Sequence, residues 1–290
     1  MGSNRHGREG HAPSMHSGAQ GADVRELKAA IDAGHVAPAY QPKVCCRTGK
    51  VDSFEALARW RRGNSTVSPE TFIPLAEQHD LIHPLTVLIT DSALHWVSRL
   101  HRDDPVNICI NVSTAVIEGR SFLEHLVDTC RQNEVAADRV VLELTESRAL
   151  ANIGLALEFV TRARLKGFHL AIDDVGTGYA SHRRLAQLPF TDMKLDKLFV
   201  LGMMSSVKSR AMVENLVNMG HRLGLRVIAE GVEDQAALDI LLDFGCDVVQ
   251  GYFIARPMDP EAATTWFHDF HAARDAWNRR HPPLPDRPAH

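Results

Sequence analysis

The chain has 290 residues, of which 44% are hydrophobic and 23% charged, and its formal net charge at pH 7 is −4. This length is sufficient for one large core, and the acidic balance without a basic stripe argues against DNA as a partner. No apolar run approaches the roughly 20 residues of a membrane span and no signal segment begins the chain, so we expect a cytoplasmic protein. Five cysteines without a C-x-x-C spacing predict neither a disulfide framework nor a zinc site.

The two ends of the chain differ in composition from the middle. Residues 1–22 are rich in Gly, Ser, His and Arg, and they predict a disordered leader or a tag remnant. Residues 273–290 contain a Pro-rich stretch and predict a tail. We therefore expect a single folded domain at residues 23–272.

Within this domain, short apolar strands alternate with amphipathic helices. The predicted strands span residues 39–42, 51–57, 106–111, 140–144, 169–172, 192–195, 226–229 and 248–252. Helices are predicted at residues 84–100, 121–132, 152–166, 209–223 and 235–244. This α/β pattern predicts a (β/α)8 barrel of the TIM type. The first two strands follow too closely for an intervening helix, so we expect a modified barrel whose first strand is antiparallel.

Polar residues occur at or near the C-terminal ends of six of these strands. They are Glu55, Asn111, Glu143, the pair Asp173 and Asp174, Lys194, and Glu230. Catalytic groups gather at the C-terminal ends of barrel strands, so we expect these side chains to converge. Converging carboxylates repel one another unless a cation neutralises them, and oxygen ligands favour Mg²⁺ or Mn²⁺. The pattern therefore predicts a divalent-metal centre.

Each of these groups also has a structural explanation when it is taken alone. Asn111 is consistent with a cap before the following helix, and Lys194 with a solvated charge at a strand end. Glu146 is consistent with a helix-capping acid, and Gln250 with a hydrogen-bonding group on the barrel rim. These explanations do not account for the repetition of polar groups at successive strand ends.

The segment Glu55-Ala56-Leu57 resembles the signature of the EAL-domain cyclic di-GMP phosphodiesterases. The similarity covers about residues 24–270 and includes residues 40–42, 72–77, 111–113, 143–146, 173–178, 229–233 and 250–252. The resemblance implies a modified TIM barrel that hydrolyses cyclic di-GMP to linear pGpG, and it leaves an upstream regulatory domain or partner protein open.

The resemblance also implies a role for each strand-end group. The implied ligands of the first of two Mg²⁺ or Mn²⁺ ions are Glu55, Asn111, Glu143 and Asp173. Asp173 would bridge to the second ion, which Asp174 helps to hold. Lys194 would orient the attacking water, and Glu230 would be either the general base or a ligand of the second ion. Five carboxylates would then balance two divalent cations and Lys194.

Further positions match groups that contact substrate or support the ligands in the family. Gln41 and Arg59 match substrate-contacting positions, while Glu233 and Gln250 match groups that orient the metal ligands. Glu146 resembles the acid that anchors the loop after the Asp pair. Because this loop lies near the dimer interface in the family, the resemblance implies a homodimer.

Departures from the family pattern follow the Asp pair. Val175 stands where a Phe is usual, and Ala180 and His182 replace a Ser and an apolar residue. These differences leave a catalytically weak or silent receptor or scaffold as an alternative. A third alternative is another Mg²⁺-dependent barrel enzyme with Lys194 as a proton-abstracting base, against which Gln41 and Arg59 argue.

Overall fold

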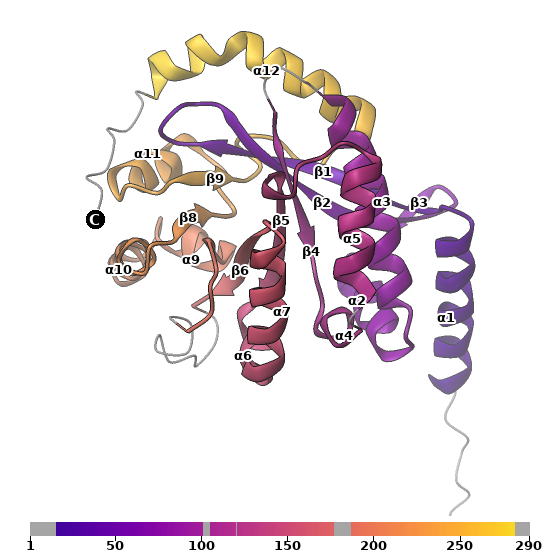
Figure 1. Cartoon of the computed structure of the whole chain (residues 1–290). Coiled ribbons are helices and arrows are strands. Elements are labelled where there is room, and N and C mark those ends of the chain that lie inside the picture. Colours follow the sequence, from indigo (N-terminus) through magenta and orange to yellow (C-terminus); the bar gives the residue numbers. More distant parts are fainter. Residues whose placement is uncertain (1–15, 101–104, 120, 177–186, 282–290) are drawn as a thin grey trace, which may run out of the picture.

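The computed structural model describes residues 16–100, 105–119, 121–176 and 187–281. Eight strands close into a barrel, with helices packed around its outside (Figure 1). The barrel strands are β1 (Val36–Cys45), β2 (Val51–Arg62), β4 (Asn107–Asn111), β5 (Val140–Thr145), β6 (His169–Val175), β7 (Asp192–Leu195), β8 (Arg226–Ala229) and β9 (Val248–Gln250). The eight predicted strands are therefore confirmed. An additional short strand, β3 (Ser65–Val67), pairs with β2 outside the barrel.

Strand β1 is antiparallel to both of its neighbours, β2 and β9, whereas the remaining barrel pairs are parallel. This confirms the predicted modification of the TIM barrel. A short turn joins β1 to β2, which leaves no length for a crossover helix. The register places Gln41 opposite Glu55 and Lys43 opposite Gln250.

The helices follow the strands in sequence and cover the outside of the barrel (Figure 1). They are α1 (His16–Asp32), α2 (Pro69–Gln78), α3 (Ile82–Leu100), α4 (Thr114–Glu118), α5 (Ser121–Gln132), α6 (Glu146–Ala151), α7 (Ile153–Leu165), α9 (Lys197–Gly202), α10 (Val207–Arg222), α11 (Gln235–Asp243) and α12 (Pro260–Arg280). Helices α1 and α12 extend across the domain boundaries that composition indicated at residues 22/23 and 272/273. None of the described helices is long and apolar enough to cross a membrane.

Successive side chains along each strand point alternately outward, into an apolar core beneath the helices, and inward, into the barrel interior. Facing outward, Tyr40 stacks on Trp96 of α3 at 3.8 Å between ring centroids, and Phe54 meets the same ring edge-on at 5.0 Å. In the barrel interior, Cys109, Val141 and Ala171 form a small separate apolar cluster. One step further toward the C-terminal ends of the strands, the inward positions become polar. The core thus supports a layer of charged side chains within the barrel.

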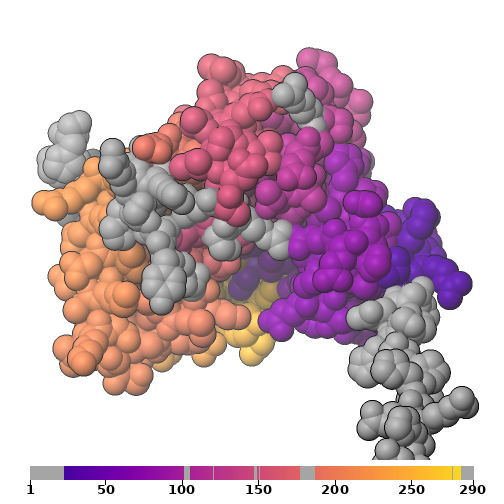
Figure 2. All heavy atoms as spheres, turned by 90° about the horizontal axis from the view of Figure 1, so that it is seen from below, coloured from indigo at the N-terminus to yellow at the C-terminus, as the bar shows by residue number. Residues whose placement is uncertain are grey.

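Figure 2 looks onto the end of the barrel where the parallel strands terminate, and it shows this face hollowed between the purple and the orange parts of the chain. These parts correspond to the β2–α3 region and the α9–α11 region of the sequence. The C-terminal ends of the strands therefore open into a recessed surface, as in other TIM-type barrels.

Candidate functional site

A cavity of about 370 Å³ occupies the C-terminal end of the barrel. It is lined by eight of the side chains that sequence analysis singled out: Gln41, Glu55, Arg59, Asp173, Lys194, Glu230, Glu233 and Gln250. Two further predicted residues, Asn111 and Glu143, line an adjoining cavity of about 300 Å³. Leu57 and Arg59 border both cavities. The structure therefore brings together residues that are up to two hundred positions apart in the sequence.

Lys194 lies at the centre of the charged layer. Its Nζ is 2.6 Å from Glu143 Oε2 and 2.9 Å from Asp173 Oδ2. The same atom is 2.7 Å from Glu230 Oε1 and 3.6 Å from Glu55 Oε2. Burial alone would lower the pKa of Lys194, but the surrounding carboxylates hold it well above its usual range. The lysine is therefore a permanent positive charge in this site.

Glu55 is held by amide groups on both of its oxygens. Asn111 Nδ2 donates to Oε1 at 2.8 Å, and Gln250 Nε2 donates to Oε2 at 2.9 Å. Burial would raise the pKa of Glu55, but Lys194, Lys43 and these two hydrogen bonds hold it below its usual range. Because Asn111 donates through its nitrogen, its amide oxygen remains oriented for another partner.

Gln250 connects this carboxylate to the first strand of the barrel. Its Nε2 also donates to Gln41 Oε1 at 3.1 Å, and Gln41 Nε2 donates to the Ala255 carbonyl at 3.2 Å. The following residue, Gly251, packs so closely that a Cβ there would lie 2.1 Å from the Val232 carbonyl oxygen. This close approach fixes the backbone that carries Gln250 and the neighbouring Tyr252.

The two aspartates of the β6 end differ in conformation. Asp173 is buried, and its Oδ1 accepts a hydrogen bond from the Asp174 backbone nitrogen at 2.8 Å. Asp174 has a φ of 58°, in the left-handed region, where the β6–β7 register shifts between Ile172 and Val175. Burial raises the pKa of Asp174 to about 6, and the negative charges of Asp173 and Asp196 add to this effect.

Glu230 follows β8 and lines the same cavity as Lys194, and the two side chains are in direct contact. Burial raises the pKa of Glu230 to about 8. Lys194 opposes this rise, whereas the nearby carboxylates of Asp173 and Glu55 increase it. In the absence of cations, the Glu230 carboxyl group therefore holds a proton more readily than an exposed glutamate does.

Glu146 contacts the start of the segment that follows the Asp pair. Its Oε2 accepts a hydrogen bond from the Gly176 backbone nitrogen at 3.0 Å, and the residue is buried. Gly176 has a φ of 104°, and a Cβ there would lie 2.8 Å from the Phe199 ring. Val175 is buried in the core. The other two departures from the family pattern, Ala180 and His182, lie outside the described residues.

Sequence analysis did not identify Lys43, which lies in the charged layer. Its side chain is 0% exposed, and its Nζ is 2.5 Å from Glu143 Oε1 and 3.7 Å from Glu55 Oε2. The sequence contains a signal for it, because Lys43 is two positions after Gln41 in one strand and must project to the same side. The predicted balance of five carboxylates against one lysine and two divalent cations therefore omits one positive charge.

The donor set fits a hard divalent cation. Within the ranges that the structure describes, no group of three or more His, Cys, Asp or Glu side chains is spaced to hold a metal as it stands. Instead, Lys194 and Lys43 lie between the carboxylates. When fully ionised, the five predicted carboxylates exceed these two lysines by three negative charges, and their ligating atoms are all oxygen. An excess of oxygen donors and negative charge is what Mg²⁺ or Mn²⁺ requires.

Aromatic and cationic side chains also border the cavity. Tyr252 is half exposed on the cavity wall, and the Arg256 guanidinium lies 4.0 Å from its ring centroid. Arg59 is partly buried, and its Nη1 donates to the Ala58 carbonyl at 2.9 Å. Tyr252 is uncharged, and Arg256 does not directly follow a strand. The pattern of charged groups at strand ends could therefore identify neither residue.

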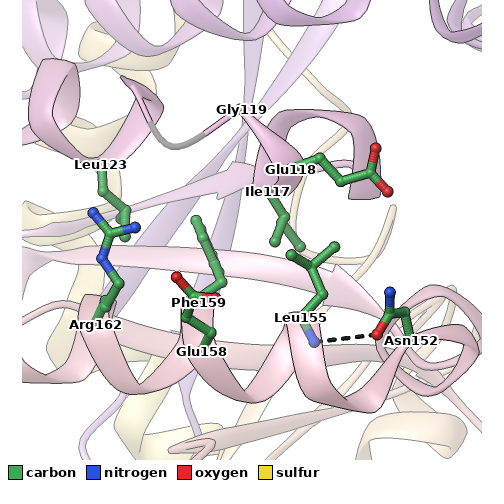
Figure 3. A pocket seen from close by; sticks show the side chains of 9 residues that line it. All are labelled: Ile117, Glu118, Gly119, Leu123, Asn152, Leu155, Glu158, Phe159 and Arg162. Atoms are coloured by element: carbon green, nitrogen blue, oxygen red, sulfur yellow. Dashed lines mark hydrogen bonds between the residues drawn. The ribbon is translucent and has the colours of Figure 1, made fainter.

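One predicted residue and one further cavity are not part of this arrangement. Glu233 lines the cavity, but its carboxylate is exposed and has no hydrogen-bond partner in the described part of the chain. A separate cavity of about 300 Å³ lies between α4, α5 and α7, with Glu118, Glu158 and Arg162 beside apolar side chains such as Phe159 (Figure 3). It contains none of the predicted site residues.

Comparison with known proteins gives a consistent result for sequence and structure. The family model described as "EAL domain" matches residues 24–257. A Pseudomonas aeruginosa protein named as a cyclic di-GMP phosphodiesterase is 36% identical over 229 residues, which are 78% of this chain and 39% of that protein. The cyclic di-GMP phosphodiesterase RocR of the same organism is 31% identical over 237 residues, covering 81% of this chain and 60% of RocR. The chain thus spans less than two thirds of either relative.

Solved structures show the same barrel. The PaMucR phosphodiesterase in its c-di-GMP complex matches with a TM-score of 0.79 and 29% identity, covering 83% of this chain and 98% of that chain. An EAL enzyme in a form bound to cAMP and cyclic di-GMP matches with a TM-score of 0.83 and 26% identity, covering 88% of this chain and 70% of that chain. These matches confirm the predicted fold class.

Proposed function

The chain belongs to the EAL domain family, as its motifs predicted, and from that premise we propose that it hydrolyses cyclic di-GMP to linear pGpG. The observation that carries this proposal is the convergence of Glu55, Glu143, Asp173 and Glu230 around Lys194 at one cavity. The names of the relatives indicate the substrate, and the presence of every expected site residue indicates that the reaction is retained.

The proposed reaction requires divalent cations, Mg²⁺ or Mn²⁺. The residues that would hold the first ion are Glu55, Asn111, Glu143 and Asp173. A second ion would be held by Asp173 and Asp174, with Glu230 as a further ligand or as the base. Such ions, when bound, lower the pKa of a coordinated water and offset the charge on the phosphoryl oxygens. The excess of three carboxylate charges over the two buried lysines supports this requirement.

Lys194 and Glu230 are the side chains that we assign to the reaction itself. Lys194 supplies a fixed positive charge that orients the attacking water and stabilises the charge developing on the phosphate. Glu230, as the base, would accept a proton from the attacking water, and its buried carboxyl group has a higher proton affinity than an exposed glutamate. Their contact of 2.7 Å lets each side chain hold the other in position before substrate binds.

The rim of the cavity supports recognition of a dianionic dinucleotide. Arg59 offers a planar guanidinium that can bind a phosphate or the edge of a guanine base. Gln41, held by Gln250, lies on the same side of the barrel and contributes a polar contact. The exposed ring of Tyr252 provides a surface on which a base can stack, and the adjoining apolar cavity at Leu57 can accept the second base.

We also propose that the domain forms a homodimer. Leu198 and Leu201 on α9, Met204 in the turn that follows, and Val207 at the start of α10 are exposed large apolar residues, and Val207 is 86% exposed. Leu201 lines the catalytic cavity as well, so an interface on this surface would adjoin the site. Because the chain spans 39% and 60% of two relatives, control by an additional regulatory domain or partner protein remains part of the proposal.

A catalytically weak or silent receptor for cyclic di-GMP is the second candidate. Val175 favours it, because a smaller buried side chain replaces the usual Phe directly after Asp174. Chromatographic separation of nucleotides after incubation with cyclic di-GMP and Mg²⁺ distinguishes the candidates. The enzyme should produce pGpG, whereas binding of cyclic di-GMP without pGpG after hours would identify a receptor.

A further inference from the structure

Lys43 is a buried cation to which the mechanism above gives no role. It lies one layer below Gln41 in β1, and its side chain is 0% exposed. Lys194 differs from it, because Lys194 borders the cavity of about 370 Å³. Lys43 lines neither this cavity nor the adjoining one, and protein atoms enclose its side chain.

The two lysines divide the oxygens of Glu143 between them. Lys43 Nζ is 2.5 Å from Oε1, and Lys194 Nζ is 2.6 Å from Oε2. A divalent cation that binds Glu143 would compete with these ammonium groups for its oxygens. Lys194 borders the cavity and Lys43 does not, so we expect the cation to approach from the side of Lys194 while Lys43 keeps its contact with Oε1.

We propose that Lys43 is a fixed counter-ion of the metal site. It keeps Glu143 and Glu55 stably buried before a divalent cation binds, and by like-charge repulsion it weakens the binding of that cation. Removing one member of a buried ion pair leaves the other charge uncompensated, which destabilises the fold. Charges at these separations interact strongly when water is excluded. The proposal rests on the proposed function, in which Glu143 and Glu55 hold a cation.

Direct cation binding tests this role without an activity assay. In the Lys43→Met variant, Mg²⁺ binding measured by isothermal titration calorimetry at about pH 9 should become at least about tenfold tighter, because a repelling charge is lost. In excess chelator the melting temperature of this variant should fall by about 5 °C or more. Saturating Mg²⁺ should remove most of the difference in melting temperature between the variant and the unmutated protein. The control Lys28→Met alters an exposed lysine paired with Asp32 and should change neither quantity.

The Lys43→Gln variant separates the charge of Lys43 from its hydrogen bond. Glutamine retains a donor for Glu143 but carries no charge, so it too should bind Mg²⁺ more tightly. Unchanged or weaker Mg²⁺ binding by both variants, beside normal binding by the unmutated protein, would overturn the role of Lys43 alone. Absence of Mg²⁺ binding by the unmutated protein would overturn the proposed metal site as well. A variant that folds only in the presence of Mg²⁺ would support the proposal, because the cation would have replaced the lost charge. Failure of both variants to fold even with Mg²⁺ would contradict the proposal.

Discussion

Lys194 and Glu230 form an ion pair of 2.7 Å on the wall of the barrel cavity, and the same lysine contacts three other carboxylates. The pair links a lysine whose pKa the surrounding carboxylates raise to a carboxyl group whose pKa burial raises. We therefore propose different roles for these two side chains and for Arg59 and Tyr252 on the rim of the cavity.

Replacing either member of this pair should reduce turnover much more than binding. We expect Lys194→Ala and Glu230→Gln each to reduce the rate of pGpG formation by about 10² or more, since water positioning or proton transfer is lost. The dissociation constant for cyclic di-GMP should change by less than about tenfold. Rapid-quench kinetics and equilibrium binding would measure the two effects, and loss of binding in parallel with turnover would contradict the assignment.

The rim should show the opposite behaviour. Arg59→Ala should weaken cyclic di-GMP binding by about tenfold to a hundredfold, because a charge-assisted hydrogen-bond donor is removed. Tyr252→Ala should also weaken binding, while Tyr252→Phe, which retains the ring, should bind normally. Calorimetric titration with cyclic di-GMP measures each effect. Equal losses for the Ala and Phe variants would exclude stacking as the role of Tyr252.

Stability without cations should depend on the ionisation of Glu230. Its folded pKa of about 8 is above its unfolded value, so the folded chain binds this proton more tightly. The resulting stabilisation is present below about pH 4 and is lost as pH rises to about 8. In excess chelator, the free energy of unfolding in urea should therefore decline with pH more steeply for the unmutated protein than for Glu230→Gln.

A matched control for this effect is Glu233→Gln, because the Glu233 carboxylate is exposed on the wall of the same cavity. This variant should retain the pH dependence of the unmutated protein. Parallel curves for the unmutated protein and Glu230→Gln would show that Glu230 is not the group responsible.

Removal of a ligand should affect the cation and the reaction together. Glu55→Ala should lower both Mn²⁺ occupancy, measured by electron paramagnetic resonance, and pGpG formation. Ca²⁺ should inhibit the unmutated protein, since its larger radius and looser coordination disfavour the geometry of the reaction. Full activity of Glu55→Ala at normal Mn²⁺ occupancy would show that Glu55 is not a ligand.

The sequence was sufficient to predict the barrel because each strand was short, apolar and separated from the next by a helical pattern. It also predicted the antiparallel β1, since the short interval between residues 42 and 51 cannot contain a crossover. The three-residue strand β3 has no buried residue, and α2 contains Pro74 in its interior, so neither produces a clear periodic signal. Local pattern therefore predicted the strands of the barrel and the helices with a regular apolar repeat, and it missed short or Pro-interrupted elements such as β3 and α2.

The site was predicted as a set of strand-end groups, but their mutual contacts depend on the closed barrel. Residues 43 and 143 are a hundred positions apart, and only barrel closure brings Lys43 within 2.5 Å of Glu143. The position of Lys43 two residues after Gln41 indicates the side to which it projects, but its contact with Glu143 depends on the closed barrel. For the same reason, charge counting from the sequence could include Lys194 and omit Lys43.

The dependence of pGpG formation on Mg²⁺ concentration tests the central claim most directly. The account predicts no pGpG in excess chelator and a rate that rises with Mg²⁺ to a plateau, in a preparation that also binds cyclic di-GMP. Undiminished pGpG formation in chelator would contradict the metal site. Tight binding of cyclic di-GMP without pGpG at any Mg²⁺ concentration would contradict the enzyme, and the combined substitutions Val175→Phe, Ala180→Ser and His182→Leu would then test whether those departures caused the loss.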